Sequence, residues 1–388
     1  MKSLVDIDIS NKNLVVRVDM NVPIRDKKIQ DPTRIKACLP TINYALERNC
    51  KVLLISHLGR PTEGSIENKY SLEPVSEYLS EILDEPVSLE KDISNTEIFK
   101  SGPRVKVLEN IRFYKGEEEN DDLFAKTLAN LCDIYINDAF SCCHRKQASV
   151  HKITKYSKNN FAGPLIQKEI KAIDMLIKDK KEPVTCLIGG SKVSTKINVI
   201  LNLIQNVNNI IILGAMANNF LVYKNQKVGK SLVENNVKEI IKKIYSEAYN
   251  NKCQILIPED FNVSKDFNGK SVTKDENSID SDDIILDIGP KTLQRVEEII
   301  KTSKTVMWNG PAGYFENINF AKGTNSLAKI ISDYTSKKSL LSIVGGGDTI
   351  SAINKSKMSL SFTHLSTAGG AFLEYLEGKD LPGITVLK

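Results

Sequence analysis

The sequence lacks the features that mark membrane, secreted and metal-binding proteins. No apolar run approaches the ~18–20 residues that a membrane-spanning helix needs. The first ten residues alternate apolar and acidic side chains, unlike a secretory signal peptide. The seven cysteines show no metal-ligand spacing, and their odd number favours a reducing compartment. These absences predict a cytoplasmic protein without a membrane partner.

The sequence also lacks a strong net charge. It has 53 Lys and Arg against 48 Asp and Glu, a formal net charge of +5, and no long basic tract. We therefore expect no nucleic-acid partner, and any anion site has to be a local cluster of cations.

Several common catalytic motifs are absent. The phosphate loop G-x-x-x-x-G-K-[ST] does not occur, because Gly229-Lys230-Ser231 lacks the first glycine of that motif. No G-x-G-x-x-G follows the first apolar run, which argues against a Rossmann dehydrogenase. Neither H-E-x-x-H nor G-x-S-x-G is found.

The chain does contain short apolar runs that alternate with longer amphipathic stretches. The runs cover residues 14–18, 51–56, 105–108, 133–138, 184–189, 209–214, 254–258, 305–308 and 340–345. Their continuous apolar character predicts strands buried on both faces. The intervening stretches, such as 34–48, 71–83, 122–131, 166–178, 196–205 and 233–250, predict helices. This alternation predicts an α/β protein with parallel sheets.

The number of strand–helix units is too large for one compact sheet, so we expect two domains in the 388 residues. The best boundary lies near 157–164, a polar stretch that ends in Gly163-Pro164. A helix that begins there would join the two halves. The predicted domains are 1–164 and 165–369.

Polar residues follow the first four long apolar runs, where ligands bind in open α/β sheets. They are Asp19 and Asn21 in RVDMNVP, His57 and Arg60 in SHLGRP, Arg112 in LENIRF, and Asp138, His144 and Arg145 in DAFSCCHR. Arg34 lies at the start of a predicted helix. Arginine suits bidentate capture of phosphate and carboxylate. Each arginine alone is commonly a solvated surface charge, but their shared position after consecutive strands favours an anion site.

Glycine-rich turns follow the runs of the second half. In residues 189–196, GGSKVSTK, paired glycines let backbone amides approach a phosphate. We expect Ser194 or Thr195 to cap the following helix, and one helical turn to place Lys192 and Lys196 on the same side. The turn 345–349, GGGDT, offers amides at a helix start, and Asp348 could hold Mg²⁺ directly or through water.

Two further turns have the same character. Residues 366–370, STAGG, form one, and 308–313, WNGPAG, form the other, with Glu316 placed to accept ribose hydroxyls. A single Gly-Gly pair is usually only a turn, whereas GGGDT after a strand favours a phosphate site. The adjacent Cys142 and Cys143 are interpreted as bystanders rather than a redox pair.

Taken together and in order, these motifs resemble those of the phosphoglycerate kinase family. The matching segments are RVDMNVP, SHLGRP, LENIRF, YINDAF, GGSKVSTKI, DIGPKT, WNGPAGYFE, GGGDT and HLSTAGGAFLEYLEGKDLPG, and they span residues 17 to 383. The resemblance implies two Rossmann-like domains with a cleft and hinge between them, and usually a monomer. It also implies that the C-terminal segment, about 370–388, packs back on the first domain.

The resemblance assigns roles residue by residue. The phosphoglycerate site would comprise Asp19, Asn21, Arg34, His57, Arg60, Arg112, His144 and Arg145. The site for ADP or ATP would comprise Lys196, Gly214, Gly313, Glu316, Gly345, Gly346, Gly347, Asp348 and Thr349, with Asp348 holding Mg²⁺. Arg34, Lys192 and the amides of Gly346 and Gly370 would stabilise the phosphoryl group during transfer.

The sequence departs from the common family pattern at a few positions. Ser141 replaces glycine, Gln147 replaces a second histidine, and Thr195 stands where many members have Asp. Ala215 stands in place of a glycine, and Ala368 and Phe372 replace smaller residues. No Arg or Lys of the implied chemistry is lost. The alternative is a non-catalytic nucleotide-binding protein that retains the fold, supported only by these substitutions.

Overall fold

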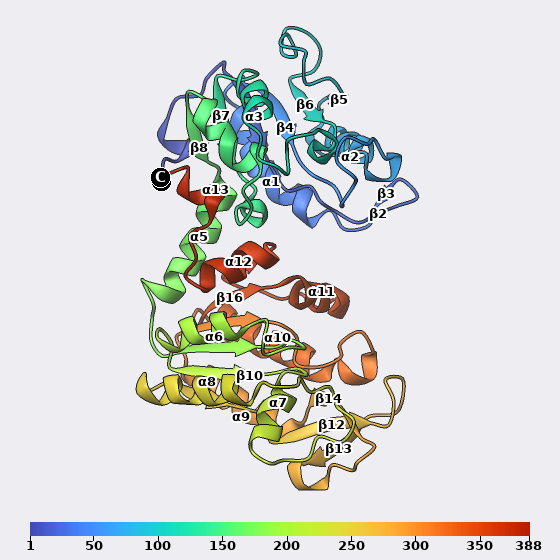
Figure 1. The fold of residues 1–388 in the computed structure, drawn as a ribbon, viewed down its shortest axis with the longest axis vertical. Coiled ribbons are helices and arrows are strands. Elements are labelled where there is room, and N and C mark those ends of the chain that lie inside the picture. Colours follow the sequence, from blue (N-terminus) through green and yellow to red (C-terminus); the bar gives the residue numbers. More distant parts are fainter. The chain divides into compact units, whose positions relative to one another are not determined.

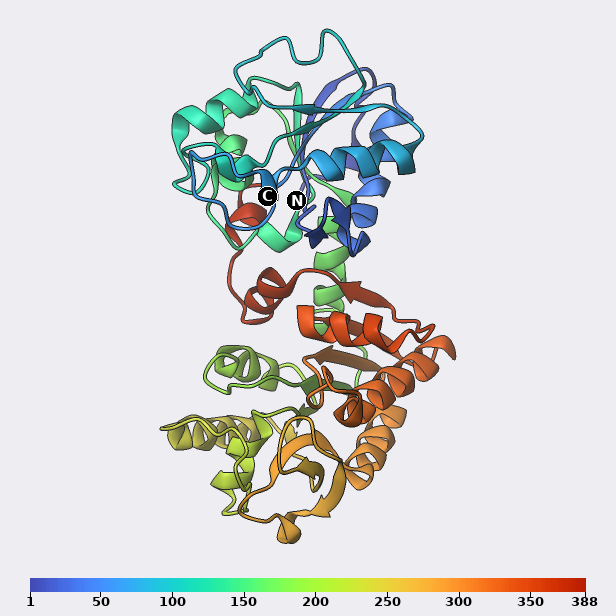
Figure 2. The same ribbon diagram turned by 90° about the vertical axis from the view of Figure 1, so that its right-hand side faces the viewer.

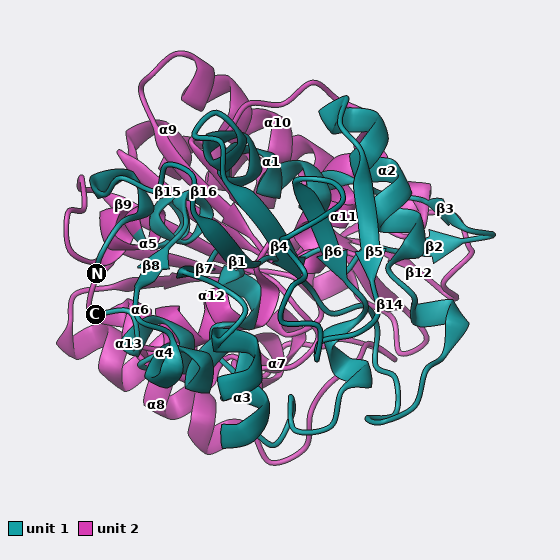
Figure 3. Cartoon of the chain, turned by 90° about the horizontal axis from the view of Figure 1, so that it is seen from above, with its two compact units in different colours: residues 1–170, 380–388 teal, residues 171–379 magenta.

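The computed structural model describes residues 1–388, which divide into two compact units. Unit 1 comprises Met1–Ile170 and Asp380–Lys388, and unit 2 comprises Lys171–Lys379; Figure 3 colours them teal and magenta. None of the helices combines the length and apolar composition that a bilayer span requires.

Unit 1 is built on a six-stranded sheet in the order β5-β6-β4-β1-β7-β8, in which all neighbours are parallel. Its strands are β1 (Asn13–Arg17), β4 (Lys51–Ile55), β5 (Val87–Glu90), β6 (Val105–Leu108), β7 (Ile134–Asn137) and β8 (Asn160–Ala162). Its helices are α1 (Thr33–Leu46), α2 (Glu73–Leu83), α3 (Asp122–Ala129), α4 (Ile153–Tyr156) and α13 (Pro382–Thr385). A small antiparallel hairpin joins β2 (Ile24–Arg25) to β3 (Lys28–Ile29).

Buried strand residues of this sheet face helices on both sides. Leu14 and Val16 of β1 pack in one core with α1 and α2, whereas Val15 packs in a second core with α3 and α4. Figure 1 labels α1, α2 and α3 beside the strands of this sheet. Because side chains alternate between the faces of a strand, a strand covered on both sides has to be apolar throughout. This explains why β1, β4, β6 and β7 are continuous apolar runs.

Unit 2 has a second parallel six-stranded sheet, in the order β11-β10-β9-β15-β16-β17. This is the strand order of a doubly wound Rossmann fold. The strands are β9 (Val184–Ile188), β10 (Asn209–Ile212), β11 (Gln254–Leu256), β15 (Thr305–Asn309), β16 (Leu341–Gly345) and β17 (His364–Ser366). The helices are α6 (Ile197–Ile204), α7 (Ala217–Tyr223), α8 (Lys238–Asn250), α9 (Pro290–Thr302), α10 (Lys322–Ser336), α11 (Gly347–Ser356) and α12 (Gly369–Leu376).

The only tryptophan of the chain is buried in the core of unit 2. Trp308 of β15 is fully buried in a core with α9 and α10, and its indole Nε1 donates to Gly310 O at 2.7 Å. A three-stranded antiparallel sheet is added in the order β13-β12-β14, from β12 (Asp260–Ser264), β13 (Val272–Asp275) and β14 (Ile284–Ile288).

The nine apolar runs all form strands, and the six helical stretches all contain helices. The prediction missed β5, β8 and β17, which are only three or four residues long, and the antiparallel sheet. Strand β13 is largely exposed and polar, so it carries no apolar run. Short edge strands and solvent-facing strands lack the continuous burial on which the prediction relied.

The boundaries of the compact units differ from those expected. Helix α5 (Pro164–Ile177) begins where the joining helix was predicted, but the first unit extends into it as far as Ile170. Of the segment 370–388, which was predicted to pack back on the first domain, residues 380–388 belong to unit 1 and residues 370–379 belong to unit 2. Helix α12 stays in unit 2, where Asn202 Nδ2 donates to Leu376 O at 2.5 Å.

The C-terminal segment completes unit 1. Gly383 N donates to Cys143 O at 2.9 Å, and Lys2 N donates to Leu387 O at 3.4 Å. The two ends of the chain therefore lie side by side, as Figure 2 shows.

Asp138 fixes the start of α5. Its Oδ1 accepts from the backbone N–H of Leu165 at 2.8 Å and of Ile166 at 3.2 Å, and Thr41 Oγ1 donates to its Oδ2. A side chain at Gly163 would put its Cβ 2.3 Å from Asp138 Cγ, so only glycine fits there. Asp138, expected near the anion site, serves as a helix cap.

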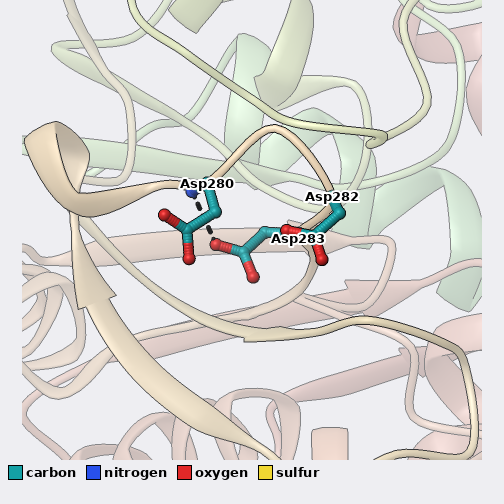
Figure 4. Close-up of side chains that lie close together, drawn as sticks. All are labelled: Asp280, Asp282 and Asp283. Atoms are coloured by element: carbon teal, nitrogen blue, oxygen red, sulfur yellow. Dashed lines mark hydrogen bonds between the residues drawn. The ribbon is translucent and has the colours of Figure 1, made fainter.

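Three aspartates lie close together in the connection from β13 to β14. Figure 4 shows Asp280, Asp282 and Asp283, whose carboxylates come within 4.8 Å of one another. Two lysines offset most of the charge of this cluster: Lys265 Nζ lies 2.9 Å and Lys274 Nζ 2.7 Å from the Asp283 carboxylate. The cluster is therefore an ion-pair network of the antiparallel sheet.

We predict that Asp283→Asn destabilises unit 2 in a pH-dependent way. Burial alone would raise the pKa of Asp283, but hydrogen bonds from Lys274 and Lys265 lower it to about 2. The carboxylate therefore stabilises the fold fully above its unfolded pKa of about 3.9 and loses this effect as pH falls through about 2.

Urea unfolding at pH ~7 should show a loss of about 2 kcal/mol for Asp283→Asn, and this gap should narrow at pH ~3. Asp282→Asn is the control, because that carboxylate is half exposed and pairs with Lys265 alone; it should change little. A stability gap that is the same at both pH values would contradict this account.

Candidate functional site

The carboxyl edge of the sheet in unit 1 carries most of the polar residues singled out from the sequence. Asp19 follows β1, His57 follows β4, and Arg145 follows β7. Strands β4 and β7 flank β1 on opposite sides, so the chain changes direction at β1. Such a switch point is where open α/β sheets bind ligands.

Asp19 is the buried acid of this edge. Its carboxylate accepts from Arg34 Nη1 at 2.8 Å, from Asn21 N at 3.1 Å and from Ser141 Oγ. Burial alone would raise the pKa of Asp19, but the charge of Arg34 and the hydrogen bonds from its neighbours bring it below its usual range. Asp19 therefore stays ionised and holds the Arg34 guanidinium at the start of α1.

His57 lies in a buried, positively charged environment. Its Nδ1 is 3.4 Å from Arg17 Nη2. Burial, helped by three nearby arginines and opposed by Asp19, lowers the pKa of His57 to about 3. The three arginines are Arg17, Arg112 and Arg145. His57 is therefore neutral at pH 7, and the surrounding excess of positive charge suits an anion.

The loop after β4 is held from both sides. Gly59 N donates to Asn21 Oδ1 at 2.9 Å, and Arg112 Nη1 donates to Gly59 O at 2.5 Å. Gly59 has a φ of +62°, and a Cβ there would lie 2.3 Å from the Tyr70 ring, so glycine is required. Arg60 is exposed just beyond this point.

The remaining predicted residues of unit 1 are His144 and Arg145. Both are half-buried, and Arg145 Nε donates to His144 Nε2 at 3.2 Å. The structure thus brings together Asp19, Arg34, His57, Arg112 and Arg145. Asn21 and His144 lie at the margin of this group, where they accept hydrogen bonds from Gly59 and Arg145.

Arg17 is a site residue that the sequence analysis missed. It is fully buried, its Nε donates to Ser149 Oγ at 3.0 Å, and Ser149 Oγ donates to Glu117 Oε1 at 2.6 Å. The signal was present, because Arg17 is the one charged residue inside the apolar run LVVRV. A buried arginine joined to a buried glutamate through a serine fixes the positive charge beside His57.

A cavity of about 450 Å³ lies in unit 2. Four predicted residues line it: Gly214, Gly313, Glu316 and Asp348. Ala215, noted as a departure from the family pattern, also lines it. A cavity of this size accommodates a nucleoside-sized ligand.

Apolar side chains that the sequence analysis did not select form much of the cavity wall. They are Leu232, Phe261, Phe267, Ile284, Leu286, Tyr314 and Phe315. Phe267 and Tyr314 form an edge-to-face pair with centroids 5.4 Å apart. Phe261, Ile284 and Leu286 come from the antiparallel sheet. The strands of this sheet were not predicted, so the sequence analysis could not assign these residues to the site. Such a wall suits the apolar faces of a nucleobase.

Lys196 and Thr349 hold loops together beside the cavity. Lys196 Nζ donates to Gly189 O at 2.5 Å and to Asn309 Oδ1 at 2.7 Å, and burial lowers its pKa to about 8. Thr349 Oγ1 accepts from Gly310 N at 2.7 Å. Neither residue lines the cavity. Their hydrogen bonds instead fix the turns that do.

Two predictions for the loop 189–196 are wrong. Helix α6 starts only at Ile197, so Lys192 and Lys196 do not share a helical turn; Lys192 is exposed and Lys196 is half-buried. Neither expected residue caps α6, because Ser194 Oγ donates to Glu234 Oε1 and Thr195 Oγ1 donates to Lys192 O. Side-chain bonds within and across the loop replace the helical turn that the spacing suggested.

The two remaining glycine turns lie where the sequence placed them. Gly345 ends β16, Gly346 has a φ of +103°, and α11 begins at Gly347. Gly370 lies in the first turn of α12, after β17. Both turns therefore present backbone amides at the start of a helix.

Comparison with known proteins agrees with this geometry. The family model described as phosphoglycerate kinase matches residues 4–379. The phosphoglycerate kinase of Wolbachia pipientis wMel is 43% identical over 394 residues, which cover 100% of this chain and 98% of that protein. That of Francisella philomiragia subsp. philomiragia is 42% identical, with the same coverage.

Solved structures give the same result. The structure of phosphoglycerate kinase from Coxiella burnetii matches with a TM-score of 0.91 and 38% identity, and covers 99% of this chain and 98% of that one. The enzyme from Pyrococcus horikoshii OT3 matches with a TM-score of 0.83 and 31% identity, over 100% and 98% of the two chains. The chain belongs to the phosphoglycerate kinase family.

Proposed function

We propose that unit 1 binds 3-phosphoglycerate or 1,3-bisphosphoglycerate and that unit 2 binds ADP or ATP. The chain then carries out the glycolytic reaction of its family, reversible phosphoryl transfer between the acyl phosphate of 1,3-bisphosphoglycerate and ADP. The observation that carries the proposal is the basic cluster around His57, which lies at the switch point of its sheet and is suited to an anion.

The proposed phosphoglycerate site has groups for each part of the substrate. The phosphate would bind to cationic and hydrogen-bonding groups of Arg60, Arg112, His144 and Arg145. His57 lies beside Arg112 and Arg145 and is proposed to bind the substrate with them. Asp19 and Asn21 are placed to bind the hydroxyl. Arg34, whose Nη1 is bonded to Asp19 Oδ2 at 2.8 Å, would also contact the reacting carboxyl group.

The proposed nucleotide site places the base against the apolar wall of the 450 Å³ cavity and the ribose at Glu316. The phosphates would meet Lys196 and the glycine turns at residues 345–347. Asp348 is an exposed carboxylate in the first turn of α11 that faces the cavity, and a carboxylate with waters and phosphate oxygens is a common Mg²⁺ environment. Asp348 would hold Mg²⁺, which neutralises phosphate charge when bound.

The chemistry needs no general base. The acceptor in the direction of ATP consumption is a carboxylate, which is ionised at pH 7 because carboxyl pKa values lie near ~4. Phosphoryl transfer then depends on positioning and on charge stabilisation. Arg34, Lys192 and the amides of Gly346 and Gly370 are proposed to stabilise the equatorial oxygens.

Both proposed sites are complete within a single copy of the chain, which supports a monomer. All seven cysteines are free thiols, as in a reducing cytoplasm.

The activity is tested by a coupled assay with 3-phosphoglycerate, Mg·ATP and excess glyceraldehyde-3-phosphate dehydrogenase, following NADH oxidation. We expect turnover that disappears when 3-phosphoglycerate is omitted. Binding of ADP by calorimetry without any turnover would instead indicate a protein that binds nucleotide but does not transfer phosphate.

We expect Arg34→Lys to lose most of the turnover, about 10²-fold, much as Arg34→Ala does. A single ammonium group cannot copy the two-pronged contact of a guanidinium. Arg25→Lys is the control, since Arg25 is largely exposed on the β2–β3 hairpin. Near-normal kcat in Arg34→Lys would rule out the two-pronged role.

Transfer also requires the two bound substrates to be brought together, because they are held on different units. We expect binding of both substrates to compact the protein, with exclusion of water from the reacting groups. Small-angle scattering should show a smaller radius of gyration for the protein with both 3-phosphoglycerate and a non-hydrolysable ATP analogue than for the protein with either ligand alone. An unchanged radius would count against closure.

A further inference from the structure

Glu234 occupies an unusual place in unit 2. Its carboxylate accepts three hydrogen bonds from the loop 189–196: from Val193 N at 2.5 Å, from Ser194 N at 3.3 Å and from Ser194 Oγ at 2.5 Å. The donors belong to the two residues that follow Lys192 in the chain. Hydrogen bonds to a charged acceptor are among the stronger ones in proteins.

The backbone of Glu234 is itself fixed. Glu234 N donates to Asn219 Oδ1 at 2.8 Å, and Asn219 Nδ2 donates to Met216 O at 3.2 Å. Asn219 is buried in α7, with 2% of its surface exposed. The carboxylate of Glu234 therefore reaches the loop from a rigid base.

The segment that precedes Glu234 forms part of the nucleotide cavity. Lys230 and Leu232 line the cavity. Lys230 N donates to Asp283 O at 2.7 Å, and Leu232 O accepts from Asn218 Nδ2 at 3.1 Å. Residues 230–232 are thus held by hydrogen bonds at the cavity wall, just before Glu234 contacts the loop that carries Lys192.

Near Lys192 the loop is also held by the Val193 side chain, which is fully buried, and by a bond from Met216 N to Gly190 O at 2.8 Å. The Lys192 side chain is exposed, Thr195 Oγ1 donates to Lys192 O at 3.0 Å, and α6 begins only at Ile197. The next anchor is Lys196, which is bonded to Gly189 O and Asn309 Oδ1. Glu234 is the acceptor that the structure shows for the amides of both residues 193 and 194.

We propose that Glu234 is a positioning residue for Lys192. It clamps the loop 189–196 to the wall of the nucleotide cavity, and this clamp fixes the backbone from which Lys192 reaches the transferred phosphoryl group. The proposal rests on the proposed function, since it assigns Lys192 to that chemistry. A misplacement of about 1 Å in such a group can cost about 10²-fold in rate.

The test uses the full chain with Glu234→Gln and Glu234→Ala. Glutamine keeps the shape and one acceptor oxygen but loses the charge and the second acceptor. Glu239→Gln is the matched control, because Glu239 is exposed in the first turn of α8. Steady-state kinetics in both substrates, thermal unfolding, and hydrogen exchange at the amides of Val193 and Ser194 in the free protein are measured.

We expect kcat to fall about tenfold in Glu234→Gln and further in Glu234→Ala, with the KM for 3-phosphoglycerate unchanged. The melting temperature of Glu234→Gln should stay within about 3 °C of the wild type. Exchange at residues 193 and 194 should accelerate, and Glu239→Gln should match the wild type in every measurement.

Unchanged kcat in Glu234→Ala would overturn the positioning role, even if the two amides exchange faster. Unchanged exchange would overturn the clamp itself. If the wild type showed no turnover, the proposed function would fail, and the exchange measurement would still decide whether Glu234 holds the loop.

Discussion

Parallel strand pairing is the constraint on which the rest of this protein depends. In each six-stranded sheet every neighbouring pair runs in the same direction, so the carboxyl ends of the strands share one edge. Buried and half-buried polar side chains hold the loops that leave this edge. Asp19 ties the loop after β1 to Arg34 and Ser141, and Lys196 ties two glycine turns together in unit 2.

Charge is distributed differently in the two units. In unit 1 several arginines lie near a neutral histidine, and Glu117 and Asp19 offset only part of their charge. That surplus favours a highly charged anion. In unit 2 the cavity joins an apolar wall to a few polar groups, including Asp348, which favours a ligand with one flat apolar end and one charged end. Fold alone would not distinguish these preferences, because both units share the α/β architecture.

The sequence predicted most of the fold and many of the residues near the candidate sites, for identifiable reasons. Strands such as β1 and β9 are buried on both faces and therefore appear as unbroken apolar runs. His57 follows β4 and Asp348 follows β16, so the parallel arrangement of the strands places both residues at the carboxyl edge of a sheet. The apolar wall from Phe261 to Tyr314 escaped notice because it depends on an antiparallel sheet in which polar residues interrupt the apolar ones of β12 and β13 is largely exposed. Ser194 and Thr195 were misread because their partners, Glu234 and the Lys192 carbonyl, are chosen by the tertiary fold rather than by local spacing.

The division of unit 1 into two stretches of chain has a consequence for the order of synthesis. Residues 380–388 leave the ribosome only after the whole of unit 2, yet Leu381, Ile384 and Leu387 are buried in unit 1 and Gly383 N bonds to Cys143 O. Cys143 lies two residues after Ser141, in the turn that contacts Asp19. The first unit to be translated is thus the last to be finished, and the apolar surface that receives the final segment has to wait uncovered while the second unit is made.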